Sequence, residues 1–167
     1  IAVNLKTPEG LEVVKRLLAG ADVVTENYRK GTLEKLGLGW DALRALNPRL
    51  VYTSVRGFGD RAGGVSPYMM WPSFDIVAQA MGGWMGITGT DAGHPVKVGG
   101  GAGDTVPGLF AAFGTMAALW HARATGQGQY VDVAMTDSIL AMSELVVSTF
   151  AYRGVSPQPV GNGIPGL

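Results

Sequence analysis

The sequence predicts an α/β fold in which crossover helices connect the strands of a parallel sheet. Helical and apolar segments alternate over the first 55 residues in the order helix, strand, helix, strand. Such alternation is typical of a parallel sheet, because consecutive parallel strands need a long connection that is usually helical. The expected strands at 50–55 (LVYTSV) and 130–135 (YVDVAM) are also rich in β-branched and aromatic residues.

The first helix is expected to begin at Thr7-Pro8-Glu9, which supplies a capping hydroxyl, a first-turn proline and an acidic residue. Apolar residues then recur at helical spacing up to Gly20, which ends the helix. A buried strand is predicted over 21–26. A helical turn from Thr32 to Gly37 and a helix over 40–46 follow, and the second strand covers 50–55.

The second half begins with a loop over 56–73 that is rich in Gly, Pro and Ser. Helices are predicted over 74–81, over the apolar stretch 106–120 and over 137–150, with a strand at 130–135 before the last of them. The tail 155–167 contains three Pro and is expected to be irregular. No internal repeat is evident.

Composition limits the possible functions. The chain has 167 residues, of which 47% are hydrophobic, and this is enough for one globular domain. Thirteen basic and 13 acidic residues give zero net charge, so we expect no bulk attraction to nucleic acid or membranes. There is no Cys, and the two His are far apart, so we predict no metal site and a cytoplasmic protein. A few clustered cations remain compatible with a small polyanionic ligand.

Asp104 is the strongest candidate for a reactive group. It follows glycines at 99, 100, 101 and 103 and precedes the long apolar helix. Glycines permit a bulky substrate to approach the backbone, and a carboxylate at this junction can face a cleft. The simpler interpretation is that Asp104 only caps the helix, since Asp is a preferred N-cap residue. The two roles are compatible.

Cations and aromatic residues follow two of the predicted strands. Asn27-Tyr28-Arg29 comes directly after the first strand, and Arg56-Gly57-Phe58-Gly59 after the second. Ligands of open parallel sheets bind beyond the carboxyl ends of the strands. These segments, joined by Lys6 and Lys35, therefore predict a nucleotide-like ligand. The alternative is that each of these cations is an ordinary solvated surface residue.

The chain resembles the class III coenzyme A (CoA) transferases, a family related to the α-methylacyl-CoA racemases. The matching stretches are IAVNLKTPEG, ADVVTENYRKGTLEKLGLGWDALRALNPRLVYTSVRGFG, GGAGDTVPGLFAAFGTMAALWHARATGQGQYVDVAM and, loosely, VGNGIPGL. They cover almost the whole chain in the family's order. The resemblance implies a Rossmann-like sheet within a fold of interlocked homodimers. It also implies that residues 1–167 are part of the large CoA-binding domain, without its opening strand and the smaller domain.

The resemblance implies further that Asp104 is the catalytic nucleophile. The family's CoA-contact segments fall on Val3, Asn4, Leu5, Lys6, Asn27, Tyr28, Arg29, Lys35, Arg56, Gly57, Phe58 and Gly59. The implied reaction moves CoA from an acyl-CoA thioester to a carboxylic acid through an aspartyl-acyl anhydride. CoA is then a substrate and product, and no metal is needed. Thr105 and Pro107 depart from residues common in the family, but neither removes the carboxylate.

Two other functions remain open. A racemase needs a histidine near the position of Phe74, and His94 is the only substitute nearby in the sequence. The chain is also compatible with a CoA-binding or dimer-forming scaffold without turnover. The sequence does not name the acyl group. Met69, Met70, Trp71, Trp84 and Met85 suggest a roomy apolar wall, although such residues are more often core.

Overall fold

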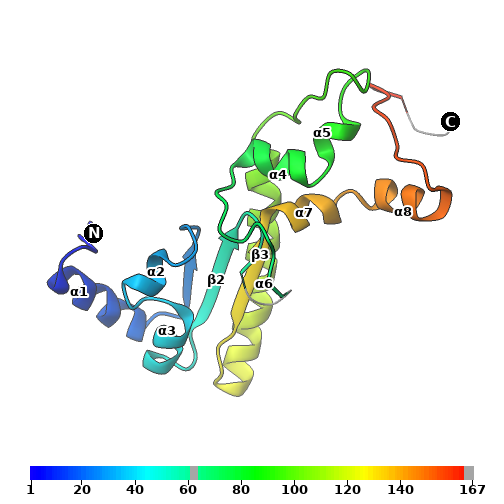
Figure 1. Ribbon diagram of the computed structural model, residues 1–167. Helices are drawn as coiled ribbons and strands as arrows, with labels where there is room; N and C mark the ends of the chain where they lie inside the picture. The colour runs from blue at the N-terminus through cyan, green and yellow to red at the C-terminus, as the bar shows by residue number, and fades with distance from the viewer. Residues whose placement is uncertain (61–63, 164–167) are drawn as a thin grey trace.

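A three-stranded parallel sheet lies at the centre of the computed structural model, which describes residues 1–60 and 64–163. The strands are β1 (Val23–Glu26), β2 (Val51–Arg56) and β3 (Tyr130–Ala134), in the order β1-β2-β3. Glu26 pairs with Ser54 and Arg56 with Ala134, so the carboxyl ends of all three strands lie at one edge. The predicted parallel α/β fold is confirmed (Figure 1).

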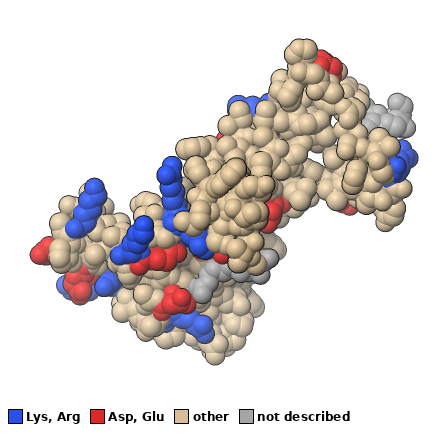
Figure 2. All heavy atoms as spheres, viewed as in Figure 1, with Lys and Arg blue, Asp and Glu red and all other residues tan. Residues whose placement is uncertain are grey.

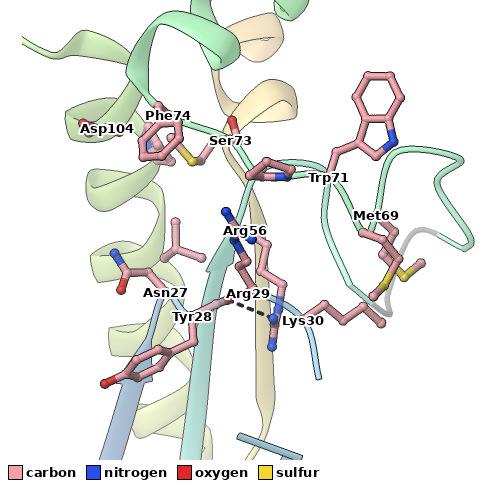
Figure 3. Close-up of a pocket in the computed structure, with 16 residues that line it drawn as sticks. Asn27, Tyr28, Arg29, Lys30, Arg56, Met69, Trp71, Ser73, Phe74 and Asp104 are labelled. Carbon is pink, nitrogen blue, oxygen red and sulfur yellow. Dashed lines mark hydrogen bonds between the residues drawn. The ribbon is translucent and has the colours of Figure 1, made fainter. Parts of the chain in front are cut away.

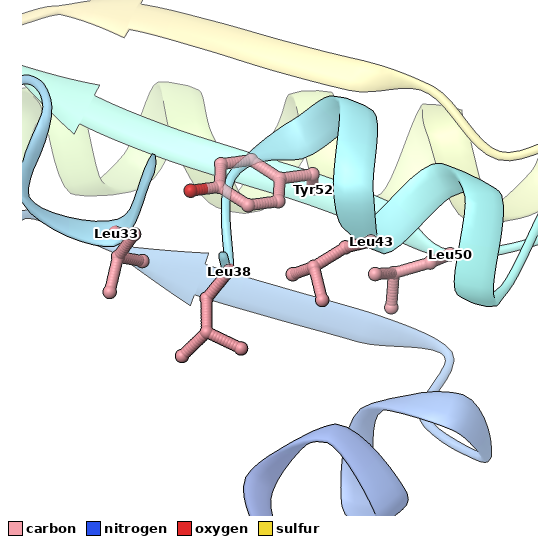
Figure 4. Close-up of a cluster of buried hydrophobic side chains, with 5 residues drawn as sticks. All are labelled: Leu33, Leu38, Leu43, Leu50 and Tyr52. Atoms are coloured by element: carbon pink, nitrogen blue, oxygen red, sulfur yellow. The ribbon is translucent and has the colours of Figure 1, made fainter. Parts of the chain in front are cut away.

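Three short helices cover one face of the sheet. They are α1 (Pro8–Ala19), α2 (Thr32–Lys35) and α3 (Trp40–Leu46). Their apolar residues surround Tyr52 of β2, and the cluster of buried side chains is Leu33, Leu38, Leu43, Leu50 and Tyr52 (Figure 4). This cluster anchors β2, whose carboxyl end lies at the edge of the sheet where we expect the ligand.

The predicted start of α1 is confirmed. The Thr7 hydroxyl accepts a hydrogen bond of 3.2 Å from the Gly10 amide, and Pro8 occupies the first turn. Gly10 is buried because the Asn4 carbonyl group occupies the space that a Cβ would need. The N-terminal segment is thereby folded back onto the first turn of the helix.

The long helix α6 (Ala102–Thr125) covers the opposite face. Its Ala118 and Ala122 pack against Val51, and the Thr115 and Thr53 hydroxyl oxygens are 2.6 Å apart. Small side chains let the helix approach the sheet closely. The outer side of α6 carries an exposed row at helical spacing: Leu109, Phe113, Met116 and Trp120, with exposed fractions of 67%, 79%, 66% and 80%.

Four shorter helices extend beyond the carboxyl edge of the sheet. They are α4 (Asp75–Met81), α5 (Trp84–Ile87), α7 (Met135–Ala141) and α8 (Glu144–Arg153). Ala78, Met135 and Ile139 form a separate core between α4 and α7. Helices α5 and α8 lie farther from the sheet (Figure 1).

Three sequence predictions need correction. The single helix expected over 137–150 is divided at Met142 and Ser143, where the Ser143 hydroxyl donates to the Ile139 carbonyl (3.0 Å). Helix α5 was not predicted. Helix α6 begins at Ala102 rather than Val106, because Gly100 and Gly101 adopt positive φ (78° and 67°) and let the chain enter the helix early. Asp104 is therefore a first-turn residue, and Gly101 occupies the cap position.

The tail contains no helix or strand over 155–163, in agreement with the sequence. Residues 61–63 of the predicted loop and 164–167 of the tail lie outside the described residues. Within the part of the chain that is described, no helix is both long and apolar enough to cross a membrane.

Candidate active site

A cavity of about 500 Å³ opens at the carboxyl edge of the sheet. It brings together predicted site residues from three parts of the chain (Figure 3): Asn27, Tyr28, Arg29, Arg56, Gly57 and Asp104. The parallel strand order explains this meeting, because the segments after β1 and β2 emerge on the same side as the first turn of α6.

The Asp104 carboxylate is exposed in the first turn of α6. No hydrogen bond or ion pair joins its side chain to any other described residue. In Figure 3 it lies beside Phe74 and Ser73, at the end of the cavity away from Lys30. A carboxylate in this setting is accessible to a molecule in the cavity.

Close packing between α4 and α6 sets the position of Asp104. The Gly103 amide donates to the Asp75 carboxylate (2.7 Å), and Gly103 is packed against the Asp75 main chain, so a Cβ at Gly103 would clash with the Asp75 carbonyl oxygen. The first turn of α6 therefore receives its cap from α4, since Gly101 has no side chain to offer.

A buried ion-pair network holds the loop that carries Asn27, Tyr28 and Arg29. Glu26 accepts a hydrogen bond from the Tyr28 amide (2.9 Å), and Arg56 donates to the Tyr28 carbonyl (3.0 Å). Glu26 and Arg56 also pair with each other at 2.9 Å. Both main-chain groups of Tyr28 are thus fixed, while the Tyr28 and Arg29 side chains stay exposed.

Arg56 is only 6% exposed, and its guanidinium faces carboxylates inside the protein. Besides Glu26 it lies 3.3 Å from Asp60 and 3.6 Å from Glu34. Burial opposes its charge, but these carboxylates more than compensate, and the pKa of Arg56 is raised. Arg56 borders the cavity as predicted, yet its charge is neutralised internally.

Asp60 extends the network toward the third strand. It pairs with Lys30 and accepts a hydrogen bond from the Tyr130 hydroxyl (2.7 Å). Burial raises the pKa of Asp60, but hydrogen bonds from Lys30 and Tyr130 and the charge of Arg56 outweigh it, so the pKa lies below its usual value. The network therefore links the carboxyl ends of β1 and β2 to β3.

Other predicted ligand residues lie outside this cavity. Phe58 and Gly59 line a neighbouring cavity of about 450 Å³. Val3, Asn4, Leu5, Lys6 and Lys35 line neither of the two. Lys and Arg side chains do stand along the edge above α1 and α2, on the side of the strand ends (Figure 2). Contact of these residues with CoA stays a prediction.

Part of the predicted apolar wall is present. Met69, Met70 and Trp71 line the cavity together with Phe74 and Met135. Trp84 instead packs against the core between α4 and α7, and Met85 is not part of the lining.

His94 lies on an exposed loop, where its Nδ1 atom is 2.9 Å from Asp91. It does not line the cavity. Among the residues that the structure describes, no group of three or more His, Asp or Glu side chains is arranged to hold a metal ion.

Sequence reasoning did not assign a role to Gln79 or Asp75. Gln79 is fully buried and bonds both to Asp75 and to the main chain of Val98. A signal in the sequence could have pointed to this pair: Gln79 is a polar residue on the apolar side of the helix DIVAQAM, four residues after Asp75 in its first turn.

Comparison with known proteins identifies the family. A sequence model described as CoA-transferase family III matches residues 1–167. A succinyl-CoA:mesaconate CoA-transferase of Haloarcula marismortui is 46% identical over the whole chain, which spans 42% of that relative. A succinyl-CoA–D-citramalate CoA-transferase of Chloroflexus aurantiacus is 40% identical, again over the whole chain and 40% of the relative. The chain thus spans about two fifths of the length of these curated relatives.

Solved structures agree with the sequence comparison. A CAIB/BAIF family protein from Brucella suis superposes with a TM-score of 0.92 at 36% identity, covering 100% of this chain and 43% of that one. Rv3272 from Mycobacterium tuberculosis gives a TM-score of 0.82 at 33% identity, over 92% of this chain and 41% of that protein. The resemblance seen in the sequence is confirmed, and the chain belongs to CoA-transferase family III.

Proposed function

We propose that the complete protein transfers CoA from an acyl-CoA thioester to a carboxylic acid, with Asp104 as the nucleophile. The observation that carries this proposal is the accessible Asp104 carboxylate in the same cavity as Asn27, Tyr28 and Arg29. The family membership supports the reaction class.

The first chemical step is attack of an Asp104 oxygen on the thioester carbonyl carbon. The new C–O bond forms an aspartyl-acyl anhydride, and the C–S bond breaks, so that the electron pair leaves with the CoA thiolate. The thiolate next attacks the aspartyl carbonyl carbon of the anhydride, and the C–O bond to the donor breaks, so that the donor acid leaves as a carboxylate and an aspartyl-CoA thioester remains. The acceptor carboxylate attacks the same aspartyl carbon, which breaks the C–S bond, expels the thiolate and forms a second anhydride. Attack of the thiolate on the acyl carbon of the acceptor then releases the new thioester and regenerates the Asp104 carboxylate.

The other end of the cavity suits the nucleotide part of CoA. Arg29 is exposed there and offers a guanidinium to phosphate, and the exposed Tyr28 ring offers a flat surface to a base. The fixed main chain of Tyr28 keeps these side chains at the mouth of the cavity, at low entropic cost to binding. Lys6 and Lys35 are further proposed contacts at the same edge, and we propose that a homodimer completes the site.

The names of the relatives guide the choice of substrates. Those cited above are named for succinyl-CoA as one substrate and for mesaconate or D-citramalate as the other. Succinyl-CoA with a panel of dicarboxylic acids is therefore the first combination to assay. No observation on the described residues favours the racemase, because Phe74 and no histidine lines the cavity together with Asp104.

Trapping the intermediate tests the proposal. The complete protein is incubated with succinyl-CoA and treated with hydroxylamine or borohydride, and mass spectrometry should find the modification on Asp104. Asp104→Ala should reduce exchange by ~10³-fold or more while CoA binding changes little. Asp22→Ala is a matched control, because Asp22 is an exposed carboxylate outside the cavity. Unchanged turnover of Asp104→Ala, or α-proton exchange without an acceptor, contradicts the proposal.

A further inference from the structure

The side-chain amide of Gln79 is paired with the main chain just before the glycine run 99–101. The Val98 amide donates to Gln79 Oε1 (2.8 Å), and Gln79 Nε2 donates to the Val98 carbonyl (3.1 Å). Both main-chain polar groups of Val98 are thus satisfied by one buried amide, in the manner of a neighbouring strand. Gln79 is fully buried and does not line the cavity that contains Asp104.

Asp75, one turn earlier on α4, continues this contact to the other end of the glycine run. Gln79 Nε2 donates to Asp75 Oδ1 (2.7 Å), which also accepts from the Gly103 amide (2.7 Å). Asp75 Oδ2 lies 3.3 Å from Lys97 Nζ. The bond from Gln79, followed by those from Gly103 and Lys97, holds the pKa of Asp75 below its usual value. Two side chains of α4 therefore hold the chain at 97, 98 and 103.

Between these anchor points the Gly101 carbonyl accepts from the Thr105 amide (3.0 Å) and hydroxyl (3.1 Å), but no neighbouring atom packs beside the three glycines. A Cβ at Gly99, Gly100 or Gly101 would meet no atom within 4 Å, and the last two have positive φ. Glycine loses more conformational freedom on ordering than any other residue, so such a run is ordered only if its ends are held. Asp104 is the third residue of the helix that follows.

We propose that Gln79 is a positioning residue for Asp104: it fixes the main chain at Val98 and the capping carboxylate of Asp75, and so sets the first turn of α6. This inference rests on the proposed function of Asp104 as nucleophile. Gln79 itself touches no substrate. Its loss should misplace the nucleophile and leave the cavity wall formed by Tyr28 and Arg29 intact.

The first test is Gln79→Met in the complete protein, since Met has a similar shape and cannot make the three hydrogen bonds. We expect kcat for CoA exchange to fall by ~10–100-fold, because a displacement of about 1 Å at the reacting group has effects of this size. KM for the CoA donor should stay within about twofold, because the interactions that bind CoA are unchanged. Amide hydrogen exchange over 99–102 should become faster. Gln127→Met, at an exposed position, is the matched control.

A second variant, Gln79→Glu, gives a test that depends on pH. While its new carboxyl group is protonated, it can still donate to Asp75 and accept from Val98, whereas the ionised form would repel the Asp75 carboxylate. The other charged side chains on elements that contact α4, or on the loop before α6, include Asp91, His94, Lys97, Asp104 and Asp137; of these, only Lys97 pairs with Asp75. The kcat of this variant relative to wild type should rise as the pH falls, while that of Gln79→Met should show no such recovery.

The outcomes separate this inference from the proposed function. A wild-type kcat in Gln79→Met, or a loss in Gln79→Glu that does not change with pH, overturns the positioning role. If Gln79→Met does not fold, the pH response of folded Gln79→Glu still decides. If wild-type protein shows no adduct on Asp104, the proposed function fails instead, and hydrogen exchange over 99–102 still reports whether Gln79 orders the run.

Discussion

The two sides of the cavity are held in place by different physical means. The loop with Tyr28 and Arg29 depends on buried charges, in which Arg56 neutralises Glu26 and Asp60. The turn with Asp104 depends mainly on a neutral amide, Gln79, and on one half-buried carboxylate, Asp75. On the first side, the stability of the sheet and the position of the loop depend on the same buried ion pairs, so a change in these pairs should affect both. On the second side, the glycine run before Asp104 is held by a side-chain amide and one carboxylate, so a change there should mainly affect the position of Asp104.

The largest effect is expected from Arg56→Met, which removes the cation that pairs with Glu26 and Asp60 beside the loop with Tyr28. Glu26 would remain buried without its cation and Asp60 would keep only Lys30, and removal of one partner of a buried pair typically costs about 3–5 kcal/mol. Urea denaturation should show a loss of this order in the free energy of unfolding. Restoring part of it with Glu26→Gln in the same chain would confirm the network.

Arg29→Ala provides the contrast for that experiment. Arg29 is exposed and lines the cavity, so its loss should leave the free energy of unfolding within about 0.5 kcal/mol of wild type. The affinity for CoA should fall by about 10-fold, as expected for loss of one charged hydrogen bond. If Arg56→Met instead keeps its stability and loses CoA affinity, Arg56 is a direct ligand contact and the comparison fails.

An intermediate effect is expected from Gly103→Ala on the amide side. The added methyl group would meet the Asp75 main chain and push α4 from α6, at a cost of about 1–3 kcal/mol, and kcat should fall with it. Gly108→Ala on the same helix is the matched control: it is exposed with open space around it, and should stabilise by about 0.5–1 kcal/mol. Equal effects at the two positions would show that the contact of α4 with α6 is not tight.

The smallest effect concerns acid stability. The pKa of Asp75 is lowered in the folded protein, chiefly by the hydrogen bond from Gln79. A carboxylate with a depressed folded pKa contributes stability above its unfolded pKa of about 3.9, and this contribution is lost as the pH falls through the folded pKa. Asp75→Asn should therefore flatten the fall in the urea midpoint below about pH 4. A pH dependence identical to that of wild type would argue against the hydrogen bonds that Asp75 accepts from Gln79 and Gly103.

Much of the site could be predicted from local sequence. The strands before Asn27 and Arg56 are evident from composition, and their parallel arrangement places both segments at one edge with Asp104. The role of Arg56 could not be predicted in this way, because its pairing with Glu26 depends on the register between β1 and β2. The helix start was misplaced for a related reason. Asp104 is a good cap by type, but the cap of α6 comes from Asp75, which lies on another helix 28 residues before the Gly103 amide that it accepts from.

Helix α6 connects the proposed nucleophile to the sheet within one continuous helix, in which Pro107 lies between Asp104 and the contact with Thr53. Its 24 residues extend about 36 Å, with Asp104 at one end and the contact between Thr115 and Thr53 near the middle. In a continuous helix, a small tilt where the helix packs on the sheet becomes a larger sideways displacement at its N-terminal end. Distance from the carboxylate is consequently a poor guide to mutational sensitivity here, and quiet-looking changes at Thr53, Gly114 or Ala118 belong in any screen for altered turnover.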